Sequence, residues 1–361
     1  MACKNHNKLL ELCFIVIIIQ MFFRVESFTP AGRTGHSSVF IGNKLYFFGG
    51  GKNEKSYSGI CFRNCWGTTV AVNYNNNDMT IFHIGGYMLD HNNKNVLISL
   101  VQTFNPLSGQ WNAPRITGVE PLRRVNIQAI ADDIGKIYVF GGVSSGTESE
   151  FFDDIIILNV NDLMWSYGSI ANPAFNRVLY TATLLSNGMI AYIGGVEETT
   201  DNIQTRSVKQ IESCCGHSAV LDGRIIILGG IKGDERKSIE PKPDLAVLKT
   251  QTTPFEWTVP QNSSNIGEFP SLAFHTANLV ENYIIITFGV LTHPNGLDKL
   301  NLSKELYLLD ISNYTWVDKF ESKSISEYTK ILYYFNDAIS KIIAIVNFMN
   351  GIKNEFIRSY I

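Results

Sequence analysis

The sequence lacks a strong charge of either sign: 30 Lys and Arg stand against 33 Asp and Glu, and the net charge is −3. This balance gives no electrostatic reason to expect a nucleic acid partner. It also lacks a Gly-x-Ser-x-Gly elbow, a His-Glu-x-x-His pair and a P-loop. No amphipathic helix pattern occurs between residues 30 and 320, where short apolar runs alternate with polar turns. These features favour an all-β sandwich, barrel or propeller.

The apolar stretch near the N-terminus is too short to span a bilayer. It runs from Leu12 to Phe23, which is 12 residues, whereas a spanning helix needs about 20. Lys4 and Lys8 precede it, and a small residue, Ser27, follows it at a plausible cleavage position. The pattern predicts a signal peptide over 1–27 and a secreted or cell-surface protein. The alternative is an uncleaved segment retained as a membrane anchor.

Cysteine is scarce, with six in the chain. Four remain after residue 27, namely Cys61, Cys65, Cys214 and Cys215. An even number permits disulfides in an exported protein, and Cys61 with Cys65 is a feasible pair. The adjacent Cys214 and Cys215 do not have zinc-ligand spacing. We therefore expect no metal site and no cofactor.

What the sequence does contain is a glycine pair that recurs at the end of short apolar runs. A buried strand that ends in paired glycines needs a backbone path closed to residues with a Cβ. Six copies indicate a repeat architecture. The copies end at Gly49 and Gly50, Gly85 and Gly86, Gly141 and Gly142, Gly194 and Gly195, Gly229 and Gly230, and the imperfect Phe288 and Gly289.

Each glycine pair lies within a larger unit of four predicted strands. A run such as His217 to Leu221 precedes the pair, and a polar turn such as Asp222-Gly223 joins the two as a hairpin. An aliphatic strand and a tryptophan follow the pair. The tryptophans of these last strands are Trp111, Trp165, Trp257 and Trp316.

The unit His-x-x-Val, Gly-Gly, aliphatic strand, Trp resembles the kelch repeat of the galactose oxidase-like β-propeller superfamily. The resemblance covers roughly residues 30 to 320 and is similar to that of fungal secreted or surface kelch proteins. It implies a kelch-type propeller over 28–320 with six recognisable blades. The tail, 321–361, is either a degenerate seventh unit or a helix. It contains the strand-like runs 331–335 and 342–346 around a turn at Asn336-Asp337.

The spacing of the repeats predicts two shortened blades. The first positions of the pairs, at 49, 85, 141, 194, 229 and 288, are separated by 36, 56, 53, 35 and 59 residues. A kelch unit is about 50 residues long. The two short intervals also lack a tryptophan after the glycine pair. We therefore expect the first and fourth blades to lack outer strands.

The repeated charged and aromatic residues are interpreted as structural. Arg33, Arg123 and Arg177 precede first strands, and His36, His217 and His275 begin them. One such residue in each blade favours a repeated contact over a converging site, and we expect the tryptophans to be buried between blades. The acidic pairs Asp153-Asp154 and Glu197-Glu198 are predicted to be solvated. A copper site like that of galactose oxidase would show a Tyr-His dipeptide, which this sequence lacks.

The predicted function is a non-catalytic interaction module. In a blade of four antiparallel strands, the loops after the second strand all emerge on one face, and here they are long. We expect this face to bind a protein or glycan partner. The candidate binding residues are Asp90, His91, Glu148, Asp234, Glu235, Arg236 and His293. The alternatives are a galactose oxidase-like copper or carbohydrate-active enzyme, and a decayed kelch paralogue.

Overall fold

The computed structural model describes residues 30–51, 65–74, 78–87, 99–145, 150–168, 176–198, 203–205, 214–232, 244–260, 270–292 and 301–320. The chain divides into two units, Met1–Pro30 and Ala31–Ile361, and every described strand belongs to the second unit. Within the described residues the second unit contains strands, turns and loops but no helix. The all-β class is therefore confirmed.

Six main antiparallel sheets follow one another along the chain, and two of them have only two strands among the described residues. These two are the predicted first and fourth blades, and we call them sheet I and sheet IV. Sheet I pairs β1 (Thr34–Ile41) with β2 (Lys44–Gly51), and sheet IV pairs β14 (Thr181–Leu184) with β15 (Ile190–Ile193). The short repeat intervals thus correspond to short sheets.

Four sheets have the predicted four strands in consecutive order. Sheet II is β3 (Thr68–Tyr74), β4 (Asp78–Ile84), β5 (Val101–Asn105) and β6 (Gln110–Asn112). Sheet III is β8 (Ala129–Ala131), β9 (Lys136–Phe140), β11 (Ile155–Asn159) and β12 (Met164–Gly168). Sheet V is β18 (Ser218–Leu221), β19 (Arg224–Leu228), β20 (Leu245–Lys249) and β21 (Glu256–Thr258). Sheet VI is β23 (Thr276–Val280), β24 (Tyr283–Thr287), β27 (Leu306–Asp310) and β28 (Thr315–Val317).

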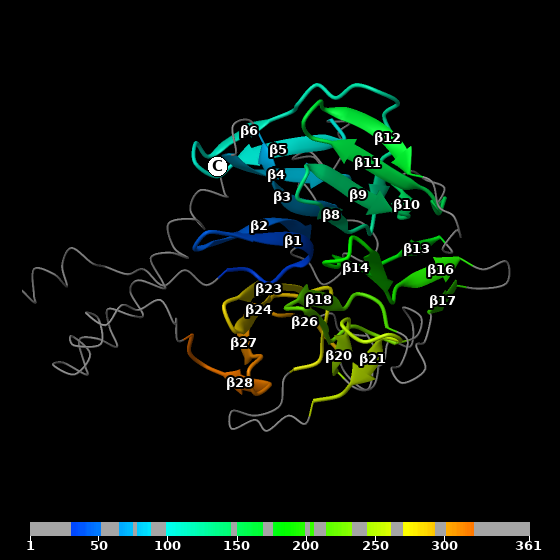
Figure 1. Ribbon diagram of the computed structural model, residues 1–361. Helices are drawn as coiled ribbons and strands as arrows, with labels where there is room; N and C mark the ends of the chain where they lie inside the picture. Colours follow the sequence, from blue (N-terminus) through cyan, green and yellow to red (C-terminus); the bar gives the residue numbers. More distant parts are fainter. Residues whose placement is uncertain are drawn as a thin grey trace, which may run out of the picture. The chain divides into compact units, whose positions relative to one another are not determined.

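The first strands of the six sheets contact one another in a closed cycle. The contacts run β1 to β3, β3 to β8, β8 to β14, β14 to β18, β18 to β23, and β23 back to β1. The ribbon shows β1 lying between β3 on one side and β23 on the other (Figure 1). Sheets arranged side by side around an axis, with first strands innermost, are the blades of a β-propeller.

Short additional strands border one end of this cycle, where the second strand of each sheet ends. They are β7 (Arg124–Val125) with β10 (Val143–Ser144); β13 (Arg177–Val178) with β16 (Val196–Glu198) and β17 (Ile203–Thr205); and β22 (Leu272–Ala273) with β25 (Val290–Leu291) and β26 (Asn301–Leu302). Single bridges, Cys65 to Tyr87 and Cys215 to Ile231, take the same place in sheets II and V.

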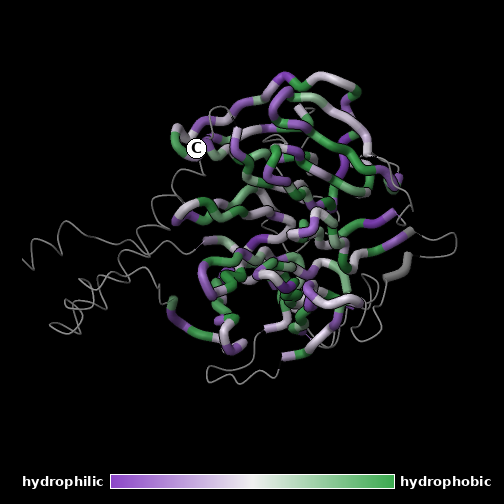
Figure 2. Tube along the Cα trace, in the orientation of Figure 1, coloured by the Kyte–Doolittle hydropathy of each residue, from purple (hydrophilic) through white to green (hydrophobic). Residues whose placement is uncertain are grey.

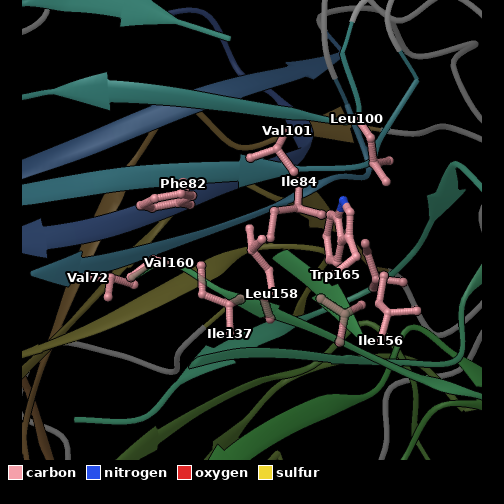
Figure 3. Packing of buried hydrophobic residues seen from close by; sticks show 13 residues of the cluster. Val72, Phe82, Ile84, Leu100, Val101, Ile137, Ile156, Leu158, Val160 and Trp165 are labelled. Carbon is pink, nitrogen blue, oxygen red and sulfur yellow. The ribbon is translucent and has the colours of Figure 1, made fainter. Parts of the chain in front are cut away.

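The core lies between neighbouring sheets, where apolar side chains of two sheets interleave. One cluster joins β4 and β5 of sheet II to β9, β11 and β12 of sheet III. Figure 3 shows Trp165 of β12 against Ile84, Leu100 and Val101 of the preceding sheet. Apolar residues colour the strands of the sheets green in the hydropathy view (Figure 2). Both faces of each sheet are apolar because each is covered by a neighbour.

Candidate functional site

The second glycine of each pair is the point where one sheet is attached to the next. Its N–H donates to a backbone carbonyl just before the first strand of the following sheet, at 2.8 to 3.0 Å. The bonds run from Gly86 to Arg124, from Gly142 to Arg177, from Gly195 to Cys214, from Gly230 to Leu272 and from Gly289 to Arg33. The last of these joins sheet VI to sheet I and closes the cycle.

The first glycine of the pair lies against that same carbonyl, so no side chain fits. Gly229 has a φ of +60°, and a Cβ placed there would be 2.3 Å from the carbonyl oxygen of Leu272. At Gly85, the equivalent separation from Arg124 O is 2.5 Å. The sequence predicted a turn that excludes a Cβ. The structure adds the reason, which is close packing between sheets.

Six residues, one before the first strand of each sheet, form a ring at this end. We call them the ring positions, and all have positive φ angles of 55° to 65°. The N–H of each donates to the carbonyl of its predecessor, from Trp66 onward, at 2.7 to 3.1 Å. The ring positions are Gly35, Trp66, Asn126, Leu179, Gly216 and Phe274. Non-glycine residues persist in this strained conformation because the surrounding structure holds them there.

The ring positions and the residues that follow them enclose a cavity of about 200 Å³. Large side chains alternate with small ones around the ring. The rings of Trp66 and Phe274 meet edge to face with their centroids 5.3 Å apart, although sheet I lies between their two sheets. Phe274 also packs where a side chain on Gly216 would lie. The cavity is lined without Asp, Glu, Lys or Arg, so it offers no charged partner to an ionic ligand.

Three histidines join neighbouring sheets beside this cavity. The Nε2 atom of each lies within hydrogen-bonding distance of a hydroxyl two residues after the ring position of the preceding sheet. The pairs are His217 with Thr181 at 2.9 Å, His275 with Ser218 at 2.7 Å and His36 with Thr276 at 3.0 Å. These side chains therefore make the repeated structural contact expected from the sequence.

The buried histidines are held in the neutral form. Burial lowers the pKa of His217 to about 4 and that of His275 to about 3, in the second case with a contribution from His217. Burial, followed by the charges of Arg33 and His275, holds the pKa of His36 well below its usual value of 6.5. A neutral imidazole whose Nε2 is already engaged is poorly suited to proton transfer at neutral pH.

Three arginines lie two residues before a ring position and donate to the carbonyl of the first glycine of their own sheet. The bonds run from Arg33 to Gly49 at 3.4 Å, from Arg124 to Gly141 at 3.0 Å and from Arg177 to Gly194 at 3.4 Å. The sequence interpretation chose Arg123 for the third sheet, whereas Arg124 holds the equivalent position. Arg123 donates instead to Gly85 and Gly86 of the preceding sheet, at 3.2 and 3.3 Å.

Two acidic residues that the sequence predicted to be solvated are ion-paired with these arginines. Arg124 is 1% exposed and meets Asp154 at 2.5 Å. Arg177 meets Glu197 at 2.8 Å, and both are buried. The prediction was wrong for these two carboxylates because it read them as a surface pair. Their partners are 20 to 30 residues away in the sequence.

The tryptophans are buried to different degrees. Trp165 and Trp316 are buried, at 5% and 8% exposure, and pack in clusters with the preceding four-stranded sheet. Trp257 packs against sheet IV and is half-buried. Trp111 follows the short sheet I and is 48% exposed. The expected burial thus depends on whether the preceding sheet is complete.

All seven candidate binding residues lie outside the described residues, in 88–98, 146–149, 233–243 and 293–300. The described strands do place the ends of their loops. In the four-stranded sheets, 14 to 18 residues separate the second strand from the third, whereas two to five residues separate the first strand from the second in all six sheets. The long loops therefore leave from the end of the cycle that carries the ring positions.

The cysteines show no ligand cluster in the described part of the chain. Cys65 is disulfide-bonded, and its partner lies outside the described residues. Cys214 and Cys215 are buried thiols, and burial raises the pKa of Cys214 to about 12. The described residues contain no group of three or more His, Cys, Asp and Glu that could hold a metal ion. Among them there is also no helix long and apolar enough to cross a membrane.

Comparison with known proteins supports the kelch-repeat propeller. The chain is 28% identical to host cell factor 2 of Homo sapiens over 185 residues, which are 49% of this chain and 19% of that protein. It is 25% identical to kelch domain-containing protein 3 of Rattus norvegicus over 191 residues, 45% of this chain and 48% of that protein. The chain thus spans about half or less of the length of these relatives.

The solved structure of YjhT shares the fold. It matches 80% of this chain and 98% of its own length with a TM-score of 0.54, at 12% sequence identity. No family model matches the sequence. The fold is therefore the predicted kelch-type β-propeller. The fungal secreted or surface type remains a prediction, since the two relatives named above are mammalian.

Proposed function

We propose that this chain is a non-catalytic interaction module that binds a protein or glycan partner through the long loops at the ring end of the propeller. The observation that carries the proposal is the position of these loops. Four segments of 14 to 18 residues leave the same end of a scaffold whose sheets are joined by a continuous series of backbone hydrogen bonds. Loops on a rigid scaffold are the usual place of recognition. The kelch-domain relatives favour a protein over a glycan.

The polar groups beneath the loops favour a structural rather than a catalytic role. The histidines at the cavity bond to hydroxyls of neighbouring sheets, and the arginines bond to glycine carbonyls or carboxylates. The Cys214 thiol, with its raised pKa, is a poor nucleophile. A galactose oxidase-like enzyme would require imidazole or phenolate ligands that these bonds leave unoccupied.

We further propose that the protein is secreted or held at the cell surface, with 1–27 acting as its signal or as a retained anchor. The disulfide at Cys65 supports an oxidising compartment, because such bonds are rare in the cytosol. Transit of the mature chain into the culture medium, with a new N-terminus at Phe28, would test this proposal. Retention in the cytosol would contradict it.

Replacement of one long loop tests the binding proposal. In one variant, residues 233–243 are replaced by a Gly-Ser linker. The control inserts four Gly and Ser residues after Asn187, in an exposed turn between first and second strands at the opposite end. Partners captured from the extracellular fraction with the parent chain are then titrated against both variants by surface plasmon resonance, and glycans are screened on an array.

We expect the loop replacement to weaken binding at least tenfold and the control insertion to leave it unchanged, with equal melting temperatures for both variants. Unchanged binding by a folded loop variant would refute the assignment of this face. Copper bound in equimolar amount by the purified protein would instead favour the enzyme alternative.

A further inference from the structure

The exposure of Trp111 shows that something is missing beside sheet I. In the complete sheets, the tryptophan of the last strand is covered by the third strand of the preceding sheet. Trp165 belongs to one cluster with Val101 of β5, and Trp316 to one cluster with Leu245 and Val247 of β20 (Figure 3). Trp111 contacts Phe48 of β2 at 5.5 Å between ring centroids, but sheet I has no third strand among the described residues.

Sheet I has an apolar outer border where a third strand would lie. Within the described part of the chain, β2 pairs with β1 alone. Phe48 faces Phe104 of sheet II, and Phe47 faces Phe288 of sheet VI on the opposite side. A strand added beside β2 would continue both faces and cover Trp111. An unpaired strand border of this kind readily accepts an extended segment.

We propose that the C-terminal tail, 321–361, completes sheet I, with 331–335 pairing antiparallel to β2 and 342–346 forming the outermost strand. Both runs are apolar and have the length of a strand, and a turn at Asn336-Asp337 separates them. The tail thus has the strand pair that sheet I lacks.

Chain topology brings the tail to this border. The tail leaves β28, the last strand of sheet VI, and the cycle places sheet VI next to sheet I. Second and fourth strands of a blade end at the ring end, and an antiparallel third strand begins there. The 14 residues from 317 to 331 can extend over about 45 Å, which is many times the spacing between strands.

The tail has no place in the cycle as a separate seventh blade. The first strand of sheet VI contacts the first strand of sheet I, and Gly289 of sheet VI donates to Arg33 before sheet I at 3.0 Å. The other short sheet, IV, lies on the opposite side of the cycle from sheet I. It therefore serves as an internal control that the tail does not complete.

Amide hydrogen exchange on the full chain tests the pairing. Tyr333→Pro removes a ladder donor from the proposed third strand, while Ser324→Pro lies in the connecting segment and is the matched control. We expect Tyr333→Pro to accelerate exchange in β2 at least tenfold and to leave β15 of sheet IV unchanged. Ser324→Pro should alter neither. Unchanged exchange in β2 of the Tyr333→Pro variant would overturn the proposal.

A double-mutant cycle gives an independent measurement that does not need the exchange data. We expect Trp111→Ala to lower the melting temperature by several degrees in the full chain and by less than about 1 °C in the Tyr333→Pro chain. Trp257→Ala, beside sheet IV, should have the same effect in both. Equal effects of Trp111→Ala in the two backgrounds, or protection of β2 that depends on protein concentration and so indicates a second copy, would overturn the proposal.

Discussion

Substitution of a paired glycine should show how tightly the sheets are attached to one another. Gly229 and Gly42 have nearly the same backbone conformation, with φ of +60° and +62°. A Cβ on Gly229 would lie 2.3 Å from Leu272 O and 2.9 Å from His275 Cε1, whereas a Cβ on Gly42 would meet nothing within 4 Å. The two alanine variants therefore share the cost of the left-handed conformation and differ only in what surrounds the new methyl group.

The expected magnitudes follow from these surroundings. Gly42→Ala should cost about 1–2 kcal/mol for the left-handed conformation. Gly229→Ala adds about 1 kcal/mol for the weakened bond from Gly230 to Leu272, together with about 1–3 kcal/mol for displacing the next sheet. For a domain of this size, about 2 °C is expected for each kcal/mol. We thus expect a fall in melting temperature of about 2–4 °C for Gly42→Ala and about 6–12 °C for Gly229→Ala.

Thermal unfolding followed by circular dichroism measures both variants, and urea titration checks the free energies. The comparison needs no assumption about the unfolded state, because the same Gly-to-Ala change is made twice in turns or strand ends of one chain. If both variants lose the same stability, the close approach between Gly229 and the next sheet does not limit the fold, and the docking role assigned to the glycine pairs is wrong.

Three further predictions concern the contacts between sheets. Stability should fall from pH 7 to pH 5 by up to about 1.4 kcal/mol per pH unit for each buried histidine, because unfolded histidine binds protons near pH 6.5 while the folded pKa of His275 is about 3. Urea midpoints test this, and a slope that His275→Asn fails to flatten would contradict it. Arg124→Met should cost about 3 kcal/mol, since it leaves the carboxylate of Asp154 without its cation; a loss under about 1 kcal/mol by urea denaturation would show that the pair is dispensable. Thr181→Val should cost about 1–3 kcal/mol by removing the hydroxyl bonded to His217 Nε2, while Thr181→Ser retains stability; equal losses would assign the effect to packing.

The repeat was predictable from the sequence because its main constraint is local. A glycine such as Gly85 or Gly229 has no tolerated substitute where the backbone of the next sheet passes within van der Waals distance, so the pair is visible in nearly every copy. The shortened first and fourth sheets followed from interval length alone. Strand order within each four-stranded sheet followed from the short turns, which allow only consecutive antiparallel pairing.

Contacts between sheets were harder to predict, because they join residues with no fixed spacing. The ring positions have no common residue type: Trp66, Asn126 and Gly216 share only a positive φ and a backbone hydrogen bond. The available signal was an arginine two residues upstream in three sheets. That signal was misread at Arg123 because two arginines are adjacent there. The candidate binding residues remain predictions, since none is described by the structure.

The order of the sheets argues against decay as the origin of the two short ones. Sheet size follows the sequence two, four, four and then two, four, four among the described residues, so the short sheets lie opposite each other in the cycle. Both keep the features that attach a sheet to its neighbours. Gly195 of sheet IV donates to Cys214, and the ring residue Leu179 donates to Asn126. Random loss of outer strands would erode these contacts as readily as the strands themselves. A unit of three sheets used twice accounts for both the retained contacts and the regular position of the short sheets.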